Sequence, residues 1–303
     1  MNSVYPILIF IAVIFCYIHV INEYKVSEDL EVYEMDYNSN TILQEMCNIR
    51  QPVIFDRPNK VNFPSLENFK QTVTIKDLKD YIDCNEVSIE TIELPCSSFL
   101  QLIKNDITAR YLSENNQTFI DESGLSKIFT DLDIEIKPNN FVTTAHDIII
   151  ASIGVCSPLR YHTDSRRFLY VAKGSLKIKM TSKKFTKYLD QIKDFENLEF
   201  RSAINIWNND NLSVIDKIQF IEFDIPCGHI LYIPSFWWYS MKFSETDTIL
   251  LECRYSSIAN KVAFMFDSFR HYLQEYNTIR GVKRVVVNKI KSDKEDINLE
   301  CVK

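Results

Sequence analysis

One segment in the second half of the sequence carries side chains that could bind a metal ion. Residues 157–164 read SPLRYHTD, so that an imidazole, His162, and a carboxylate, Asp164, are two positions apart. On a β-strand this spacing places both side chains on the same face, because strand side chains alternate. Imidazole and carboxylate groups are common metal ligands. The residues leave an alternative open, in which Asp164 instead pairs with Arg166 or Arg167, or lies in solvent.

A second segment, residues 226–239, reads PCGHILYIPSFWWY. The order of the two segments resembles the cupin-like JmjC family of oxygenases, which use Fe(II) and 2-oxoglutarate. In that family the motif S/T-P-x-H-x-D supplies two iron ligands, a strand-turn-strand follows, and P-G-D-x-L-x-I-P-x-x-W-W-H supplies the third. Residues 51–54 (QPVI) and 110–115 (RYLSEN) are similar to two earlier family segments. The resemblance therefore covers about residues 46–256.

The resemblance implies site residues at the matching positions. Iron would be held by His162 and Asp164, with Tyr239 standing where the family has its distal histidine. Such a ligand set leaves coordination positions open for the keto-acid and for oxygen. Ser157 and Lys177 would assist the binding of 2-oxoglutarate.

The sequence departs from the family pattern where the chemistry depends on it. A phenol with a pKa of about 10, as at Tyr239, is a poor ligand for Fe(II) near neutral pH. Aligning the chain on its Ser-Pro pair places Arg160 and His162 at the ligand positions, and an arginine cannot ligate a metal. By strict count the family lysine falls on Leu176, with Lys177 beside it on the other face of the strand. These departures predict an incomplete iron site.

The residues support two hypotheses about function. The first is a degenerate relative of 2-oxoglutarate-dependent protein hydroxylases, which binds a ligand or a protein partner without iron. The alternative is an active Fe(II)/2-oxoglutarate-dependent oxygenase that hydroxylates a protein side chain.

The composition of the chain argues against two other classes of protein, those that bind nucleic acid and those that bind nucleotides. The 303 residues carry a formal net charge of −7, which disfavours nucleic acid as a partner. Only 5 glycines and no G-x-G-x-x-G motif argue against a nucleotide site.

The surrounding pattern predicts the elements that must position these residues. Apolar runs predict strands at residues 148–153, 168–172, 176–180, 220–225, 229–233, 238–243 and 248–255, the second and third forming a hairpin. Helical spacing predicts short helices at residues 74–82 and after Pro95, and a longer one through Val262, Phe266, Phe269, Tyr272 and Tyr276. Short strands of this kind indicate a sandwich or barrel. With the resemblance, the expected fold class is mainly β with flanking helices around a double-stranded β-helix (cupin jelly roll).

The N-terminal residues predict membrane attachment. Residues 4–20 contain no Asp, Glu, Lys or Arg. The length of this run is near the shortest that crosses a bilayer as a helix. We predict a single-pass transmembrane anchor at residues 1–22 rather than a signal peptide, because no basic segment precedes the run and no small-residue cleavage site follows it. A stalk at 23–45, the JmjC-like domain at 46–257 and a C-terminal helical arm and tail at 258–303 complete the chain. The apolar stripe of the arm requires a partner surface, either the barrel or a second copy in a homodimer. The sequence leaves the side of the membrane open.

Overall fold

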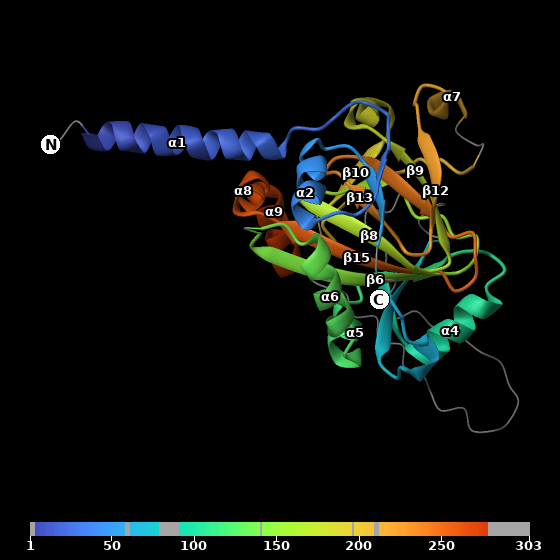
Figure 1. Cartoon of the computed structure of the whole chain (residues 1–303). Helices are drawn as coiled ribbons and strands as arrows, with labels where there is room; N and C mark the ends of the chain where they lie inside the picture. The colour runs from blue at the N-terminus through green and yellow to red at the C-terminus, as the bar shows by residue number, and fades with distance from the viewer. Residues whose placement is uncertain are drawn as a thin grey trace, which may run out of the picture.

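The computed structural model describes residues 4–57, 61–78, 91–139, 141–195, 197–208 and 212–277. Over these residues the protein is mainly β, with two sheets, flanking helices and one long N-terminal helix that projects from the body (Figure 1). The predicted fold class is confirmed at this level.

The larger sheet has nine strands and is antiparallel except at one edge. In spatial order it contains β1 (Tyr33–Met35), β2 (Val53–Asp56), β13 (His229–Ile233), β8 (Arg166–Lys173), β15 (Ile249–Ser256), β6 (Thr143–Ala151), β5 (Tyr111–Ser113), β3 (Thr72–Asp77) and β4 (Thr91–Pro95). Only β1 and β2 pair in parallel. The predicted strand at 229–233 has the bounds of β13.

The smaller sheet has six antiparallel strands. In spatial order it contains β10 (Gln191–Asp194), β11 (Glu199–Ser202), β7 (Arg160–Tyr161), β14 (Trp238–Lys242), β9 (Ser175–Thr181) and β12 (Ile221–Pro226). The predicted hairpin of residues 168–180 is wrong, although both of its strands exist. The chain turns at Gly174, which has φ +76°, and passes from β8 in one sheet to β9 in the other.

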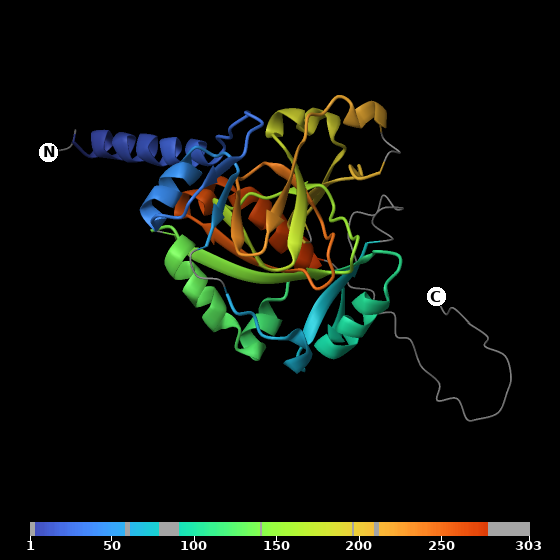
Figure 2. The same cartoon turned by 45° about the vertical axis from the view of Figure 1, so that its right-hand side comes forward.

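The two sheets enclose one apolar core, and helices cover the outer face of the larger sheet. Along β8, Leu169 and Val171 belong to the core shared with Leu176 and Ile178 of β9. The alternate side chains of β8, such as Tyr170, face the other way. They pack under α2 (Asn40–Asn48), α4 (Cys96–Asn105), α5 (Gln117–Ser123) and α6 (Ser126–Ile136) (Figure 2). Both faces of the central strands of the larger sheet are therefore buried by apolar side chains, as the continuous apolar runs in β6, β8 and β15 require.

The N-terminal helix α1 (Val4–Glu23) is joined directly to the folded body. It is long and apolar enough to cross a membrane by length and composition, and no part of its apolar window is buried in the protein. Residues 23–45, predicted to form a stalk, contact the folded body. Val26 and Leu30 pack against the apolar core, β1 joins the larger sheet, and α2 buries Leu43. These apolar residues are spaced along an otherwise polar segment, and they are the ones that contact the body.

Two further segments differ from, or refine, the expected helices. Residues 72–77 form strand β3 rather than the start of a helix, because tertiary pairing with β4 and β5 outweighs the local capping pattern. The remainder of that predicted helix, residues 79–82, lies outside the described residues. The C-terminal helix is split into α8 (Ile258–Ala263) and α9 (Met265–Asn277). The smaller elements are α7 (Leu212–Ile215) and the 3₁₀ turns η1 (Leu66–Asn68) and η2 (Lys183–Tyr188).

Candidate functional site

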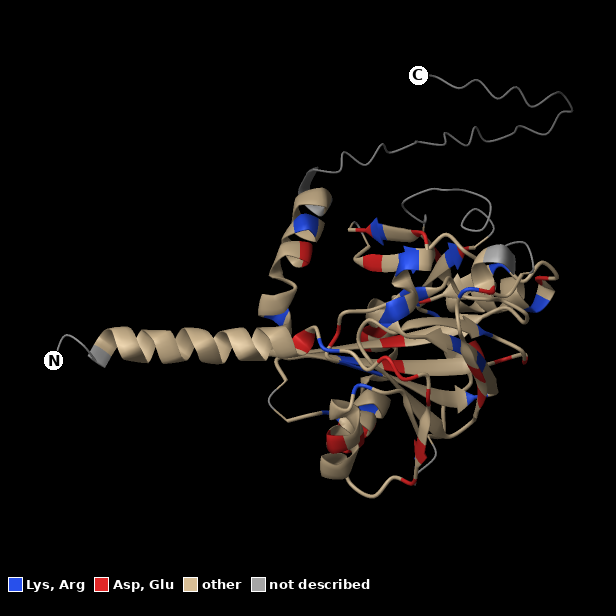
Figure 3. Cartoon of the chain, turned by 90° about the horizontal axis from the view of Figure 1, so that it is seen from above, with Lys and Arg blue, Asp and Glu red and all other residues tan. Residues whose placement is uncertain are grey.

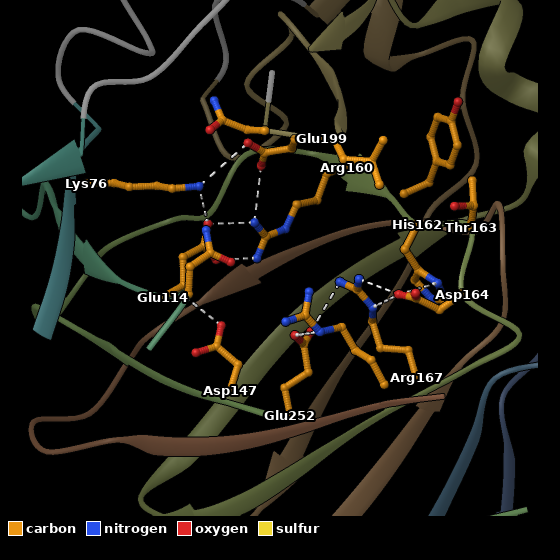
Figure 4. A pocket seen from close by; sticks show the side chains of 15 residues that line it. Lys76, Glu114, Asp147, Arg160, His162, Thr163, Asp164, Arg167, Glu199 and Glu252 are labelled. Atoms are coloured by element: carbon orange, nitrogen blue, oxygen red, sulfur yellow. Dashed lines mark hydrogen bonds and ion pairs between the residues drawn. The ribbon is translucent and has the colours of Figure 1, made fainter. Parts of the chain in front are cut away.

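A charged cavity of about 150 Å³ lies at one end of the space between the two sheets. Strands of both sheets line it, and charged side chains point into it (Figure 4). The basic ones are Lys76, Arg160, Arg167 and Arg254. The acidic ones are Glu114, Asp147, Asp164, Glu199 and Glu252. Beyond the cavity the space between the sheets is filled by the apolar core. The cavity is therefore the polar end of an otherwise apolar space between the two sheets.

One group of ion pairs joins four elements around Glu114, which follows β5. Its carboxylate accepts from Lys76 Nζ at 2.7 Å and from both terminal nitrogens of Arg160 at 2.7 and 2.9 Å. Arg160 also pairs with Glu199 at 3.2 Å. Burial alone would raise the pKa of Glu114, but Arg160 and Lys76 outweigh it and hold the pKa well below its usual value. Glu114 is therefore a permanent carboxylate that ties β3 and β7 together.

A second group of ion pairs is centred on Arg167 of β8. Its Nη2 donates to Asp164 Oδ2 at 2.7 Å, and its Nη1 donates to the Tyr239 hydroxyl at 2.9 Å. Nη1 also lies 3.2 Å from Glu252 Oε1, and Glu252 pairs in turn with Arg254 at 3.3 Å. The alternative in which Asp164 pairs with a neighbouring arginine is thus confirmed, with Arg167 as the partner. Burial alone would raise the pKa of Asp164, but Arg167 brings it down to about 2.

The structure brings His162, Asp164 and Tyr239 together around the same guanidinium. The rings of His162 and Tyr239 are 6.3 Å apart between centroids, and His162 Nδ1 is 3.8 Å from Asp164 Oδ2. His162 Nε2 lies 3.1 Å from the carbonyl oxygen of Ile233, which only accepts, so Nε2 carries the proton. Burial and then Arg167 lower the pKa of His162 to about 3. The imidazole is neutral, and its buried Nδ1 lone pair has no hydrogen-bond donor among the described residues.

These residues do not fit a ferrous ion. The cation that neutralises Asp164 is Arg167, and the same guanidinium donates to the Tyr239 oxygen that a metal would need. The alignment on the Ser-Pro pair does not fit a ferrous ion either, because it places Arg160 at a ligand position. It lies directly across from Tyr239 in the β7–β14 pair, with its guanidinium 5.8 Å from the phenol ring. In both alignments an arginine takes the place of a ligand or of the ion.

The residues expected to assist 2-oxoglutarate do not line the cavity. Ser157 precedes β7, and its Oγ accepts from the backbone N–H of Met241 in β14 at 2.8 Å. Lys177 is on the outer face of β9, where it pairs with Glu222 at 2.9 Å. Leu176, at the family lysine position, is completely buried in the apolar core. The strand alternation that the sequence showed thus directs Lys177 away from the cavity.

Sequence reasoning missed most of the charged residues of the cavity. Glu252 and Arg254 alternate with Cys253 and Tyr255 in β15, a signal that both charges lie on one face of the strand. Asp147 directly precedes the apolar run 148–151 of β6 and is itself buried. Burial and the nearby Glu252 raise the pKa of Asp147 to about 6, even though the backbone N–H groups of Asn115 and Asn116 donate to it. Lys76 and Glu114 had no local signal for joining this cavity.

A separate cluster with a metal-ligand donor set lies on the outer face of the larger sheet. Asp133, His146 and Cys253 offer ligand atoms within 4.8 Å of one another. His146 Nε2 is 3.0 Å from Asp133 Oδ1, which also accepts from the Tyr255 hydroxyl at 2.5 Å. Burial and then Asp133 raise the pKa of the Cys253 thiol well above its usual value. A metal bound here would have to displace a proton from that thiol.

No family model matches the chain, and no curated protein matches it. The fold and the cavity thus define only a general class. It is a mainly β protein with an ion-paired cavity between two sheets and one N-terminal apolar helix suited to a membrane anchor.

Proposed function

We propose that the protein is a membrane-anchored, JmjC-like double-stranded β-helix protein whose cavity binds a small polar ligand or a partner side chain without iron. Strand order supports the fold. Eight strands in chain order are β6, β7, β8, β9, β12, β13, β14 and β15. Numbered 1 to 8, they are ordered 1-8-3-6 in the larger sheet and 2-7-4-5 in the smaller one. This is the order of a two-sheet roll built from eight antiparallel strands.

The observation that carries the proposed function is the position of Arg167. Its guanidinium contacts Asp164, Tyr239 and Glu252 at 2.7 to 3.2 Å, so the acidic groups of the site are already neutralised. A metal ion that took Asp164 Oδ2, the oxygen that faces His162 Nδ1 at 3.8 Å, would have to displace this guanidinium and break buried ion pairs. Breaking such a pair generally costs about 3–5 kcal/mol. A weak ligand set that includes a phenol would not recover this cost.

The chemistry of the walls defines the ligand class. Both signs of charge face the cavity, and most of them are already paired, so a ligand needs hydrogen-bonding groups rather than a large net charge. The neutral His162 presents its Nδ1 lone pair, which suits a ligand that donates an N–H or O–H. A volume of about 150 Å³ suits a small molecule or one side chain of a partner.

The experiment measures iron content and 2-oxoglutarate decarboxylation on the full chain in detergent, after anaerobic incubation with Fe(II). We expect substoichiometric iron and no decarboxylation. Stoichiometric iron with turnover that is lost in His162→Ala, but kept in the outer-face control Lys177→Ala, would instead establish the active oxygenase.

Native mass spectrometry of the full chain tests the ligand-binding half of the proposal. We expect a small polar molecule to be retained by the native protein and lost in His162→Ala. The matched control Lys177→Ala should retain it. A native protein that carries no additional mass after incubation with a mixture of amino acids and small carboxylic acids would contradict ligand binding.

A further inference from the structure

Helices α8 and α9 carry apolar side chains that no other described part of the chain covers. Ile258 and Phe266 are 67% and 71% exposed, and Phe269 is 55% exposed. Val262 of α8 and Met265 and Leu273 of α9 are also exposed, and within α9 Phe266, Phe269 and Leu273 follow one another at steps of three and four residues. Such steps place side chains on one side of a helix. We call these six residues the α8–α9 stripe.

Helix α9 contacts the body through polar residues, whereas an ordinary surface helix packs through its apolar side. His271 Nδ1 donates to the carbonyl oxygen of Phe195 at 2.8 Å, and the guanidinium of Arg270 lies 5.3 Å from the Phe195 ring. Among residues 265–274 of α9, whose burial the structure describes, Asp267 and His271 are the ones partly buried. A surface helix normally packs its apolar side on the protein and leaves its polar side to water. Here polar residues contact the body and the apolar side is left outside.

The base of α1 is fixed to the same surface. The buried carboxylate of Glu23 accepts from Ser165 Oγ at 3.1 Å, Ser257 Oγ at 3.3 Å and Asn260 Nδ2 at 3.3 Å. The Tyr24 hydroxyl donates to the carbonyl oxygen of Ala263 at the end of α8, at 2.5 Å. These contacts hold the end of α1 against α8.

Helices α1 and α9 run in different directions. Figure 3 shows α9 running crosswise to α1, close to the point where α1 meets the body. The 20 residues of α1 span about 30 Å, which matches the hydrocarbon thickness of a bilayer. If α1 crosses a bilayer, Glu23 is at the boundary of the hydrocarbon layer and α9 lies along it. Exposed apolar residues at this level are in the position that interfacial helices occupy.

We propose that the α8–α9 stripe inserts into the interfacial layer of the bilayer that α1 crosses. The inference rests on α1 being the membrane anchor of the proposed function. The ligand is the acyl-chain boundary of the lipid, contacted by Phe266, Phe269 and Leu273. Two attachments that run crosswise, one through the bilayer and one along it, fix the orientation of the domain. The cavity is then held at a constant height above the membrane surface.

The test uses the full chain in phosphatidylcholine vesicles that contain a lipid with a spin-label quencher near the headgroup. Phe269→Trp places a reporter on the stripe. Ile134→Trp, at a position of α6 that is 74% exposed, is the matched control. After correction for the native tryptophans, we expect the Phe269→Trp fluorescence to fall at least twofold more than that of the control. Equal quenching of the two reporters would overturn the proposal.

A third reporter separates failure of the inference from failure of the anchor. Phe10→Trp lies within α1, and a quencher near the bilayer centre should reduce its fluorescence. If Phe10→Trp is quenched and Phe269→Trp is not, the stripe does not insert, although the anchor does. If neither is quenched, the anchor fails as well. A dimer in detergent that dissociates in Phe266→Ser/Phe269→Ser, with an unquenched stripe reporter, would assign the stripe to a second copy.

Discussion

Replacing Arg167 by glutamine measures how much the guanidinium stabilises the fold by neutralising the acidic groups around it. Arg167 pairs with Asp164 at 2.7 Å and Glu252 at 3.2 Å, and donates to Tyr239 at 2.9 Å. Removing one partner of a buried ion pair generally costs about 3–5 kcal/mol. Because Arg254 still pairs with Glu252, we expect Arg167→Gln to lower the free energy of unfolding by about 3 kcal/mol near neutral pH.

The free energy of unfolding lost in Arg167→Gln should depend on pH. The ionisation of Asp164 decides whether this loss grows or shrinks as the pH falls. In the native protein its folded-state pKa is lowered to about 2. The carboxylate therefore contributes stability above its unfolded-state pKa of about 3.9, and this contribution is lost as the pH falls towards about 2. Without Arg167, burial dominates and the folded-state pKa rises above the unfolded one. Asp164 then destabilises the fold at neutral pH, and this destabilisation disappears as the group protonates.

Urea unfolding of the full chain in detergent, followed by tryptophan fluorescence between about pH 4 and pH 8, provides the assay. The difference between the native protein and Arg167→Gln should be largest near neutral pH and shrink towards the acid end. The control is Lys173→Gln, which removes an exposed pair with Asp247 and should cost less than about 0.5 kcal/mol. A loss for Arg167→Gln below about 1 kcal/mol, or one that grows towards acid pH, would refute the reasoning.

Three other predictions concern metal binding, the turn between the sheets and a buried thiol. The double variant Arg167→Gln/Tyr239→His should gain Co(II) binding by calorimetry, because it removes the competing cation and replaces the phenol by an imidazole. Gly174→Ala should lower the free energy of unfolding by about 3 kcal/mol, because its Cβ would be 2.5 Å from a threonine hydroxyl and its φ is +76°. Cys253 should resist iodoacetamide in the folded protein at about pH 8, as mass spectrometry can show, because burial raises the pKa of its thiol.

Each of these predictions has a matched control in the chain. Tyr239→His alone should bind no Co(II), and binding by this single variant would show that Arg167 does not block the site. Gly124→Ala tests backbone strain alone, since its φ is +74° with no atom within 4 Å of the added Cβ, and should cost about 1 kcal/mol. Equal losses at the two glycines would remove the steric argument. Cys227 is exposed and should be alkylated under the same conditions. A Cys253 that reacts as fast as Cys227 would contradict its burial.

Local patterns predicted several strands but not their partners. The strand expected at 229–233 is β13, and those expected at 220–225, 238–243 and 248–255 overlap β12, β14 and β15. Alternation and apolar runs are properties of a few consecutive residues, so a sequence displays them directly. The hairpin expected at Gly174 failed for a different reason. A glycine turn permits a reversal of the chain, but whether the two strands pair or enter opposite sheets depends on distant strands.

The candidate site likewise contains one ion pair that the local sequence suggested and others that only tertiary contacts establish. The pairing of Asp164 with Arg167 is local, three residues apart, and was among the alternatives that the sequence raised. The lysine proposed for 2-oxoglutarate pairs with Glu222 on the outer face. Glu114 joins Lys76 and Arg160 from strands that are 38 and 46 positions away along the chain. No short pattern contains those separations, so the ion pairs of the cavity were not predicted.

By itself the sequence determined the apolar N-terminal helix, most of the strands and the identity of the residues that cannot ligate iron. These depend on side-chain type and on spacing within one element. Only the tertiary structure decided that Arg167 lies among His162, Asp164 and Tyr239, that Glu23 fixes α1 to α8, and that the apolar side of α9 faces outward. Each of these facts depends on contacts between strands and helices far apart in the chain, where packing and the pairing of buried charges choose among arrangements that are locally equivalent.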